Sequence, residues 1–182
     1  MEINLSTEYV VAIISLVGVA LSALVAYFTS IITQKNSYRD EYYKTIIERR
    51  LDAYNFIDTQ LMVMRMTVYD ETDGKYYHVF FDNESSKFFE YQRNLTHATV
   101  RSIWVSAEML EAITILSHIF YEISDSISDD KEENIKVGKD YYDKLWIAQL
   151  NVSKALVTDI ADLYDVDSFI KRKKNAYNKK SK

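Results

Sequence analysis

The chain contains no cysteine, no proline and only three glycines among its 182 residues. The absence of cysteine excludes disulfides, thiolate metal sites and cysteine nucleophiles. Because proline and glycine are the residues that most often end or kink a helix, their scarcity predicts long, uninterrupted helices. Gly18, Gly74 and Gly138 lie more than 50 residues apart, so they cannot form the glycine cluster of a phosphate-binding loop.

Residue patterns typical of catalytic or metal-binding sites are absent from the sequence as well. The histidines are His78, His97 and His118. None has a glutamate three positions before it, as a di-iron helical bundle needs, and no His-Glu-x-x-His or Gly-x-Ser-x-Gly motif occurs. The carboxylate pairs Glu108/Glu111 and Asp159/Asp162 have a helical spacing that is typical of a solvated helix face rather than of an acid–base pair. The sequence therefore predicts a non-enzymatic protein that needs no metal and no cofactor.

The longest uncharged stretch runs from Tyr9 to Gln34, between Glu8 and Lys35. As a helix its 26 residues would extend roughly 39 Å, whereas the hydrocarbon core of a bilayer is roughly 30 Å thick. The stretch is longer than the apolar core of a signal peptide and has no basic residue before it. We therefore expect an uncleaved transmembrane helix over residues 9–34, preceded by a short extracytoplasmic segment, residues 1–8.

Basic residues follow this predicted transmembrane helix closely. They are Lys35, Arg39, Lys44, Arg49 and Arg50. By the positive-inside rule, these charges place the N-terminus outside and the following domain in the cytoplasm. The sequence thus predicts a single-pass protein of the plasma (inner) membrane.

Small residues recur at every fourth position within the predicted transmembrane helix. They are Gly18, Ser22, Ala26 and Ser30. Small side chains at this spacing allow two helix backbones to approach closely, which favours self-association of the helix. The alternative is that the stripe reflects only the general abundance of small residues in membrane helices.

Residues 36–69 predict one long helix with a heptad seam. The seam residues alternate in steps of four and three: Tyr43, Ile47, Arg50, Tyr54, Ile57, Leu61, Met64 and Val68. Arg50 interrupts the apolar pattern, but its stem can lie along apolar surface while its guanidinium stays in water. The seam faces either the domain's own helices or a second protomer.

The helical pattern breaks over residues 70–83, where Asp73-Gly74 is a turn signal. Two interpretations of the segment 67–82 stand: a short hairpin, or an ordered loop packed on the helices. The segment carries four aromatic residues, Tyr76, Tyr77, Phe80 and Phe81. Because aromatic residues in loops often anchor interfaces, they are candidates for partner binding, with packing as the alternative.

Further helical segments follow. They cover residues 84–104, 107–127 and 131–164. The first two form either two helices or one kinked helix, and Ser106 is expected to cap the second. Asp130 with Glu133 gives the third a start like that of a capping box. The predicted fold is all-α: a transmembrane helix, then an antiparallel bundle of three to four long helices over residues 35–164, with the short hairpin or loop at 67–82.

The last residues, 165–182, differ from the acidic remainder of the chain. The net charge is −5, yet residues 171–182 hold seven basic residues and no acidic one. They include Lys171, Arg172, Lys173, Lys174, Lys179 and Lys180. With little apolar content, the segment is expected to be a flexible tail. Three interpretations rank in order: a solubilising terminus, attraction to the anionic cytoplasmic leaflet, and contact with nucleic acid.

Stretches from three parts of the chain carry a resemblance to known proteins. They are IIERRLDAYNFI, IWVSAEMLEAITIL and LWIAQLNVSKALVTDIADLY. Together with the N-terminal anchor, they resemble small uncharacterised single-pass proteins of bacteria, phages and mobile elements. The matching positions are Arg49, Arg50, Leu51, Ala53, Tyr54, Ser106, Glu108, Leu145, Trp146, Asp162 and Leu163. The resemblance implies accessory or antiviral-defence cargo and assigns no residue a role.

This architecture predicts a non-enzymatic, membrane-anchored helical module. We expect it to self-associate through the anchor and the heptad seam, as a homo-oligomer, and to bind a protein partner in the cytoplasm. The alternative is a membrane-disrupting effector of a toxin or anti-phage defence system, triggered through its cytoplasmic domain. Nucleic acid is not an expected partner, because the body of the chain is acidic.

Overall fold

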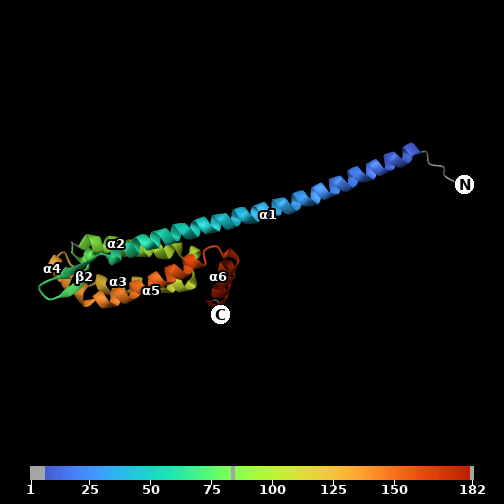
Figure 1. Cartoon of the computed structure of the whole chain (residues 1–182). Helices are drawn as coiled ribbons and strands as arrows, with labels where there is room; N and C mark the ends of the chain where they lie inside the picture. The colour runs from blue at the N-terminus through green and yellow to red at the C-terminus, as the bar shows by residue number, and fades with distance from the viewer. Residues whose placement is uncertain (1–6, 83–84, 181–182) are drawn as a thin grey trace. The chain divides into compact units, whose positions relative to one another are not determined.

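The computed structural model describes residues 7–82 and 85–180, and this part of the chain is mostly helical (Figure 1). Within it lie six α-helices and one two-stranded hairpin. The chain divides into two compact units: an N-terminal unit, residues 1–45, and a C-terminal unit, residues 46–182. The predicted helical fold class, with a long N-terminal helix, is confirmed.

Helix α1, Thr7–Arg65, is the longest element and contributes residues to both units. The sequence predicts two successive helices here, but no helix breaker lies between them, and the backbone stays helical throughout. The helix ends at Arg65 rather than at residue 69, because the chain then enters a strand. Val68, predicted as the last seam residue, therefore lies in that strand and not in the helix.

A β-hairpin follows α1, so the hairpin interpretation of the segment after the seam is confirmed. Strand β1, Thr67–Asp70, pairs antiparallel with strand β2, Lys75–His78, and Asp70 lies opposite Lys75 at the turn. Gly74 in the turn has a φ of 70°, in the left-handed region that glycine adopts without steric cost. The turn signal in the sequence thus reflects a real conformational requirement.

Short and long helices alternate after the hairpin. They are η1 (Val79–Phe81), α2 (Ser85–Val100), η2 (Arg101–Trp104) and α3 (Ala107–Ser124), where η marks a 3-10 helix. The chain thus forms two α-helices here rather than one kinked helix, because η2 and the extended Ser106 separate them. Ser106 caps α3 as predicted, since its Oγ accepts a hydrogen bond from the N–H of Met109 at 3.0 Å.

The prediction of one helix over residues 131–164 is wrong, because the structure has two: α4, Lys131–Asp140, and α5, Tyr142–Ala161. The first begins as predicted at Asp130, whose Oδ1 accepts a hydrogen bond from the N–H of Glu132 at 2.8 Å. The two helices have different partners, since α4 packs on β2 and η1 whereas α5 packs mainly on α3. The chain must therefore turn between them.

The core of the C-terminal unit is formed by side chains of α1, α2, α3, α5 and the hairpin segment. Helices α3 and α5 run antiparallel: Glu122 near the end of α3 pairs with Lys144 near the start of α5. Aromatic side chains from η1, α2 and α3 contact one another in this core: Phe80, Phe81, Phe88, Tyr91 and Phe120. Burial of each such side chain contributes about 1.5–3 kcal/mol, so this aromatic cluster is a main source of stability.

Gly138 allows α4 to lie directly against the aromatic cluster. A Cβ at this position would lie 2.7 Å from two atoms of the Phe81 ring. That separation is well below the 3.5–4.0 Å of a normal carbon–carbon contact, so any larger residue would force the helix or the ring to move. The close contact allows α4 to pack on the hairpin side of the unit, whereas α5, which follows it, packs mainly on α3.

The segment predicted to be a flexible tail, 165–182, contains a helix. Helix α6 spans Val166–Lys180. At its start, Asp165 Oδ1 accepts a hydrogen bond from the N–H of Ser168 at 3.1 Å. The side chains of Val166 and Phe169 are buried. The prediction is wrong for the residues of α6, because two apolar side chains and a capping bond fix the first turns of a helix whose composition is otherwise polar.

Candidate functional site

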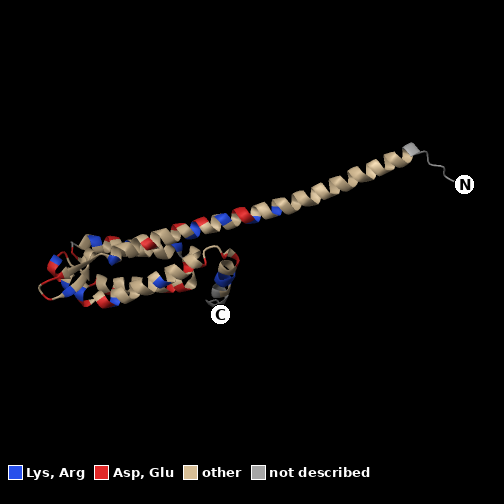
Figure 2. Ribbon diagram, viewed as in Figure 1, with Lys and Arg blue, Asp and Glu red and all other residues tan. Residues whose placement is uncertain are grey.

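The N-terminal unit presents an apolar helix surface from Tyr9 to Ile32. Every large apolar side chain in this range is exposed, for example Leu16 by 73% and Val19 by 70%. Lys, Arg, Asp and Glu are absent from this part of α1 and reappear only further along the helix (Figure 2). Among the described residues, α1 is the one helix that is long and apolar enough to cross a membrane.

The four residues predicted to mediate self-association of the anchor lie on this surface. Gly18, Ser22, Ala26 and Ser30 are all exposed. The Oγ of Ser22 donates a hydrogen bond to the carbonyl of Gly18 at 2.8 Å, which satisfies the hydroxyl within the helix. A Cβ at Gly18 would meet no atom within 4 Å, so the chain's own packing does not require glycine there. Self-association through this stripe stays a prediction.

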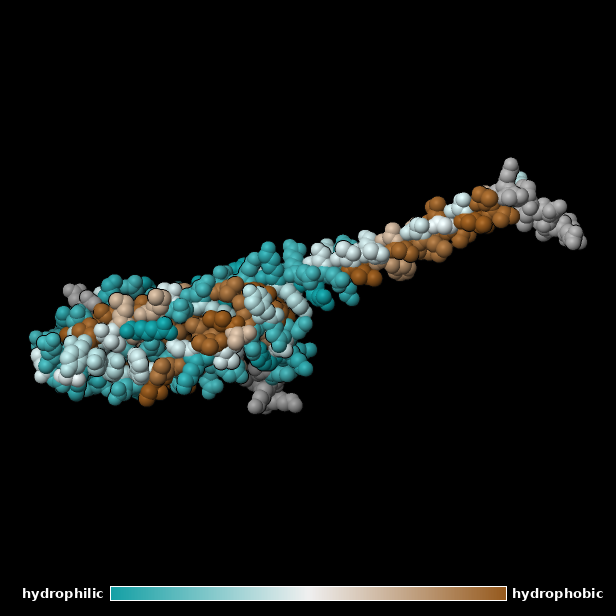
Figure 3. All heavy atoms as spheres, viewed as in Figure 1, coloured by the Kyte–Doolittle hydropathy of each residue, from teal (hydrophilic) through white to brown (hydrophobic). Residues whose placement is uncertain are grey.

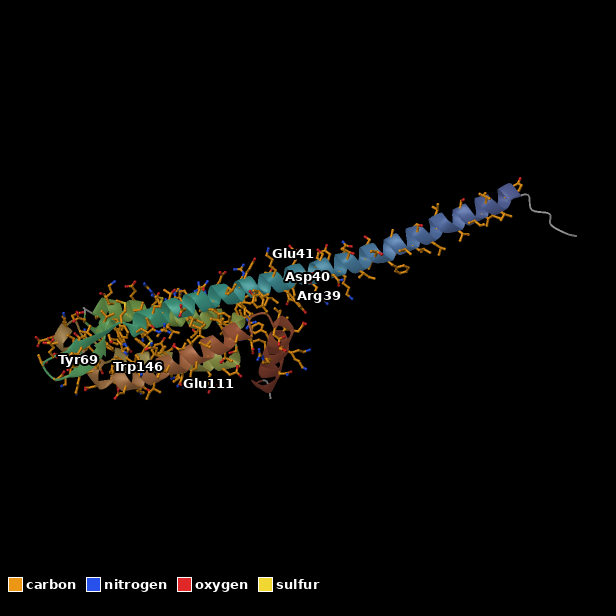
Figure 4. The ribbon with its side chains drawn as sticks, viewed as in Figure 1. Arg39, Asp40, Glu41, Tyr69, Glu111 and Trp146 are labelled. Atoms are coloured by element: carbon orange, nitrogen blue, oxygen red, sulfur yellow. The ribbon has the colours of Figure 1, made fainter. Side chains whose placement is uncertain are left out.

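The basic residues after the apolar surface have two kinds of surroundings. Four of them, Lys35, Arg39, Lys44 and Arg49, are exposed on α1. Arg39, labelled in Figure 4, lies beside the acidic Asp40, with 4.0 Å between its Nε and the Oδ1 of Asp40. Arg50, in contrast, is 1% exposed. It therefore belongs to the interior of the C-terminal unit and not to a charged surface.

Arg50 joins three helices of the C-terminal unit. Its Nη1 donates to the carbonyl of Leu163 at 2.8 Å, and its Nη2 donates to the carbonyl of Asp159 at 3.3 Å. These carbonyls lie at the C-terminal end of α5, where carbonyls lack helical partners and the helix dipole favours a cation. The guanidinium also lies over the ring of Phe169 in α6, 4.2 Å from the ring centroid. Arg50 thus connects α1 with the end of α5 and the start of α6.

Tyr54, one turn further along α1, completes this contact. The Nε and Nη2 of Arg50 donate to the Tyr54 hydroxyl at 3.0 and 2.8 Å. Burial and, to a smaller extent, the nearby charge of Asp159 raise the pKa of Tyr54 to about 12, so the phenol is neutral at physiological pH. Asp159 itself accepts a hydrogen bond from the N–H of Ser106, at 2.9 Å from its Oδ2. We use the name Arg50 node for five residues: Arg50, Tyr54, Ser106, Asp159 and Phe169.

The prediction that Arg50 keeps its guanidinium in water is wrong, because that group is buried and bonded to backbone carbonyls. The other seam residues from Tyr54 to Met64 are buried in the core of the same chain. Tyr43 and Ile47 are half-buried. The seam residues Tyr54, Ile57, Leu61 and Met64 are therefore not free to face a second protomer.

The aromatic candidates for partner binding are mostly part of the core. Tyr77, Phe80 and Phe81 are buried, whereas Tyr76 is 48% exposed and stacks on Tyr142 of α5 with 5.9 Å between the ring centroids. The packing alternative therefore describes three of the four residues. On the outer side of the hairpin, Lys139 of α4 binds both turn carboxylates, Asp70 at 2.6 Å and Asp73 at 2.9 Å.

His78 is the one histidine in the chain's described part that is fully buried. Its Nδ1 lies 2.7 Å from the carbonyl of Met64, and its ring stacks on Phe80. Burial lowers the pKa of His78 to about 4, so at neutral pH the ring is neutral and its Nδ1–H donates to Met64. No hydrogen-bond partner for Nε2 is found among the described residues. The ring is thus a packed core element.

The remaining candidates lie apart from one another. His97 and His118 are exposed, and the described residues contain no cluster of three or more His, Asp or Glu side chains that could hold a metal ion. The basic residues Lys171, Arg172, Lys173 and Lys174 lie on α6, where Arg172 pairs with Asp162 at 3.0 Å. Lys179 and Lys180 belong to the last turn of that helix, and their side chains lie outside the described part.

Comparison of the chain with protein-family models, with curated proteins and with solved structures finds no match in any of the three. The resemblance to single-pass proteins of bacteria and phages therefore stays a prediction. Sequence reasoning missed the Arg50 node, although one signal was present: a basic residue placed in an otherwise apolar seam needs acceptors from another element of the fold.

Proposed function

We propose that the protein is a single-pass, membrane-anchored helical module without enzymatic activity, which self-associates and binds a protein partner through a cytoplasmic helical bundle. The observation that carries the proposal is the uncharged and exposed apolar surface of α1 from Tyr9 to Ile32. The exposed basic residues that follow it support an orientation with the C-terminal unit in the cytoplasm.

The size of this apolar surface favours a bilayer as its environment. Transfer of one Val, Leu, Ile or Phe side chain from water to an apolar medium is favourable by about 1.5–3 kcal/mol. Summed over the large apolar residues from Tyr9 to Ile32, the gain is on the order of tens of kcal/mol. The hydroxyl of Ser22 is compatible with that environment, because it is already bonded to a helix carbonyl.

The anchor and the core share one helix. Residues of α1 before Gln34 form the apolar surface, and the seam residues Arg50, Tyr54, Ile57, Leu61 and Met64 of the same helix are buried in the C-terminal unit. No glycine or proline lies between Gly18 and Gly74, so the sequence provides no flexible linker between anchor and core. This continuity supports an anchor that is part of the working protein and not an interchangeable tether.

Membrane extraction of the full-length chain tests the proposal. The wild-type protein is expected to stay in the membrane pellet after washing with alkaline carbonate, which releases peripheral proteins. The double substitution Leu21→Arg with Leu24→Arg should move a large share to the soluble fraction, because each arginine at a helix centre costs about 2.5–3.5 kcal/mol of insertion free energy.

The matched control is Leu51→Arg, which makes the same change at an exposed leucine of the C-terminal unit. This variant should stay in the pellet like the wild type. Release of the wild-type protein by carbonate, or equal release of L51R and the double variant, would contradict the anchoring.

A further inference from the structure

We propose that the outward face of α5 pairs with the same face of a second copy of this chain. The face consists of Trp146, Ile147, Leu150, Ser153, Val157 and Ile160, and we call it the α5 stripe. The inference deepens the proposed self-association, and it rests on the exposure and spacing of these side chains.

Helix α5 has two apolar faces, and only one of them is covered by its own chain. The inner face is buried: Leu145, Ala148, Val152 and Leu156. The α5 stripe is exposed by 39% at Trp146, 60% at Ile147, 41% at Leu150, 69% at Val157 and 48% at Ile160. Figure 4 labels Trp146 on this helix, and Figure 3 shows apolar side chains at the surface of the C-terminal unit. A helix face that meets only water is normally polar.

The spacing of the stripe is that of a coiled-coil seam. Trp146, Leu150, Ser153, Val157 and Ile160 follow one another in steps of four, three, four and three. This alternation keeps the five positions on one side of a helix and directs them to a partner helix of the same pitch. None of the five is charged, so two identical stripes can meet without placing like charges together.

The exposed area is sufficient for a dimer. Together with Tyr164, which is 81% exposed just after the helix, the α5 stripe exposes roughly 600 Å² per copy. Pairing would remove roughly 1,200 Å² from water in total, which reaches the lower limit of a stable protein interface. An uncovered patch of this size is at the upper end of the range for the largest patch on a monomeric protein, about 300–600 Å², and such patches are often functional.

Contact between the same face of two identical chains is made about a two-fold axis. Each α5 stripe then meets the identical stripe of the other copy, and residues on the axis meet their own counterparts.

Ser153 gives this arrangement a polar layer. It is half-buried at the centre of the stripe, between Leu150 and Val157. In a pair whose two-fold axis passes at Ser153, its hydroxyl meets the hydroxyl of the other copy, and the two can bond to each other. One such polar layer in an apolar seam fixes the register at some cost in stability.

Disulfide crosslinking in native membranes tests the pairing, because the full-length chain has no cysteine of its own. The single variant Ser153→Cys, at the centre of the stripe, should give a crosslinked dimer on mild oxidation. The matched control is Asn151→Cys, an exposed residue of the same helix that lies off the stripe. It should crosslink poorly, and adding Leu150→Glu to S153C should reduce its crosslinking about tenfold, as expected for a loss of about 1.4 kcal/mol of pairing free energy.

Two results would overturn the inference. They are absent crosslinking of S153C and equal crosslinking of N151C and S153C. Carbonate extraction of each variant is read in parallel. Release of the protein from membranes contradicts the anchoring, whereas loss of S153C crosslinking in protein retained by the membrane contradicts the α5 contact alone.

Discussion

Replacement of Arg50 by methionine should strongly destabilise the C-terminal unit. Methionine keeps an unbranched apolar stem but removes the guanidinium, which donates to the Tyr54 hydroxyl and to carbonyls at the end of α5, among them those of Asp159 and Leu163. These acceptors are buried, and a buried acceptor without a donor costs about 1–3 kcal/mol. Because the substitution leaves several such acceptors unpaired, we expect a loss of about 3–5 kcal/mol for Arg50→Met.

Thermal unfolding of the full-length protein in mild detergent measures this effect, with helix content followed by circular dichroism. For a domain of this size, 1 kcal/mol shifts Tm by about 2–4 °C, so Arg50→Met should lower Tm by roughly 6–20 °C. The control is Arg49→Met, the same change at the exposed neighbour. Arg50→Lys should also fail to restore stability, because an ammonium cannot bridge the hydroxyl and the carbonyls as the planar fork does. Equal Tm values for R50M and R49M would refute the role assigned to Arg50.

Other predictions follow from single contacts. Loss of Arg50 should also expose α6, whose Phe169 lies over the guanidinium, and trypsin should cut between Lys171 and Lys174 faster in R50M than in R49M. Gly138→Ala should lower stability by about 1–3 kcal/mol, because its Cβ would lie 2.7 Å from the Phe81 ring, and Phe81→Leu in the same chain should recover part of the loss. The folded-state pKa of His78 is below its unfolded value, so its contribution to stability is present above pH 6.5 and is lost as pH falls towards 4. The difference amounts to about 3 kcal/mol, and it should be absent in His78→Phe when unfolding is measured across that pH range. Gly18→Leu with Ser22→Leu should reduce association of the anchor in a two-hybrid assay for membrane helices, while Ala23→Leu, off the stripe, should not.

The sequence predicts well those elements that depend on local chemistry. The hairpin follows from Asp73-Gly74, because the turn needs a residue with positive φ, and the start of α3 follows from a serine that can cap it. The long α1 follows from the lack of breakers. These features depend on residues a few positions apart, so a single sequence contains the information.

The features that the sequence does not reveal depend on contacts between distant residues. The break between α4 and α5 occurs where Gly138 approaches the Phe81 ring. The start of α6 packs on the rest of the unit through Phe169, which is buried against Arg50. Arg50 itself reaches carbonyls more than 100 residues away, so its burial could not be read from its neighbours. The α5 stripe forms a second heptad series in the sequence. The inner face of the same helix has the stronger apolar pattern, so sequence reasoning finds only that face.

Cysteine labelling along α1 tests the central claim, that the N-terminal part of this helix lies in a bilayer. Single cysteines introduced in the cysteine-free chain at Val17, Leu21 and Val25 should resist a water-soluble maleimide in intact membranes, while Ser37→Cys and Thr45→Cys should react once the cytoplasmic side is accessible. In detergent-denatured protein all five should react equally. Uniform labelling of all five positions in intact membranes would contradict the anchoring, since it would show that the apolar surface of α1 is in contact with water.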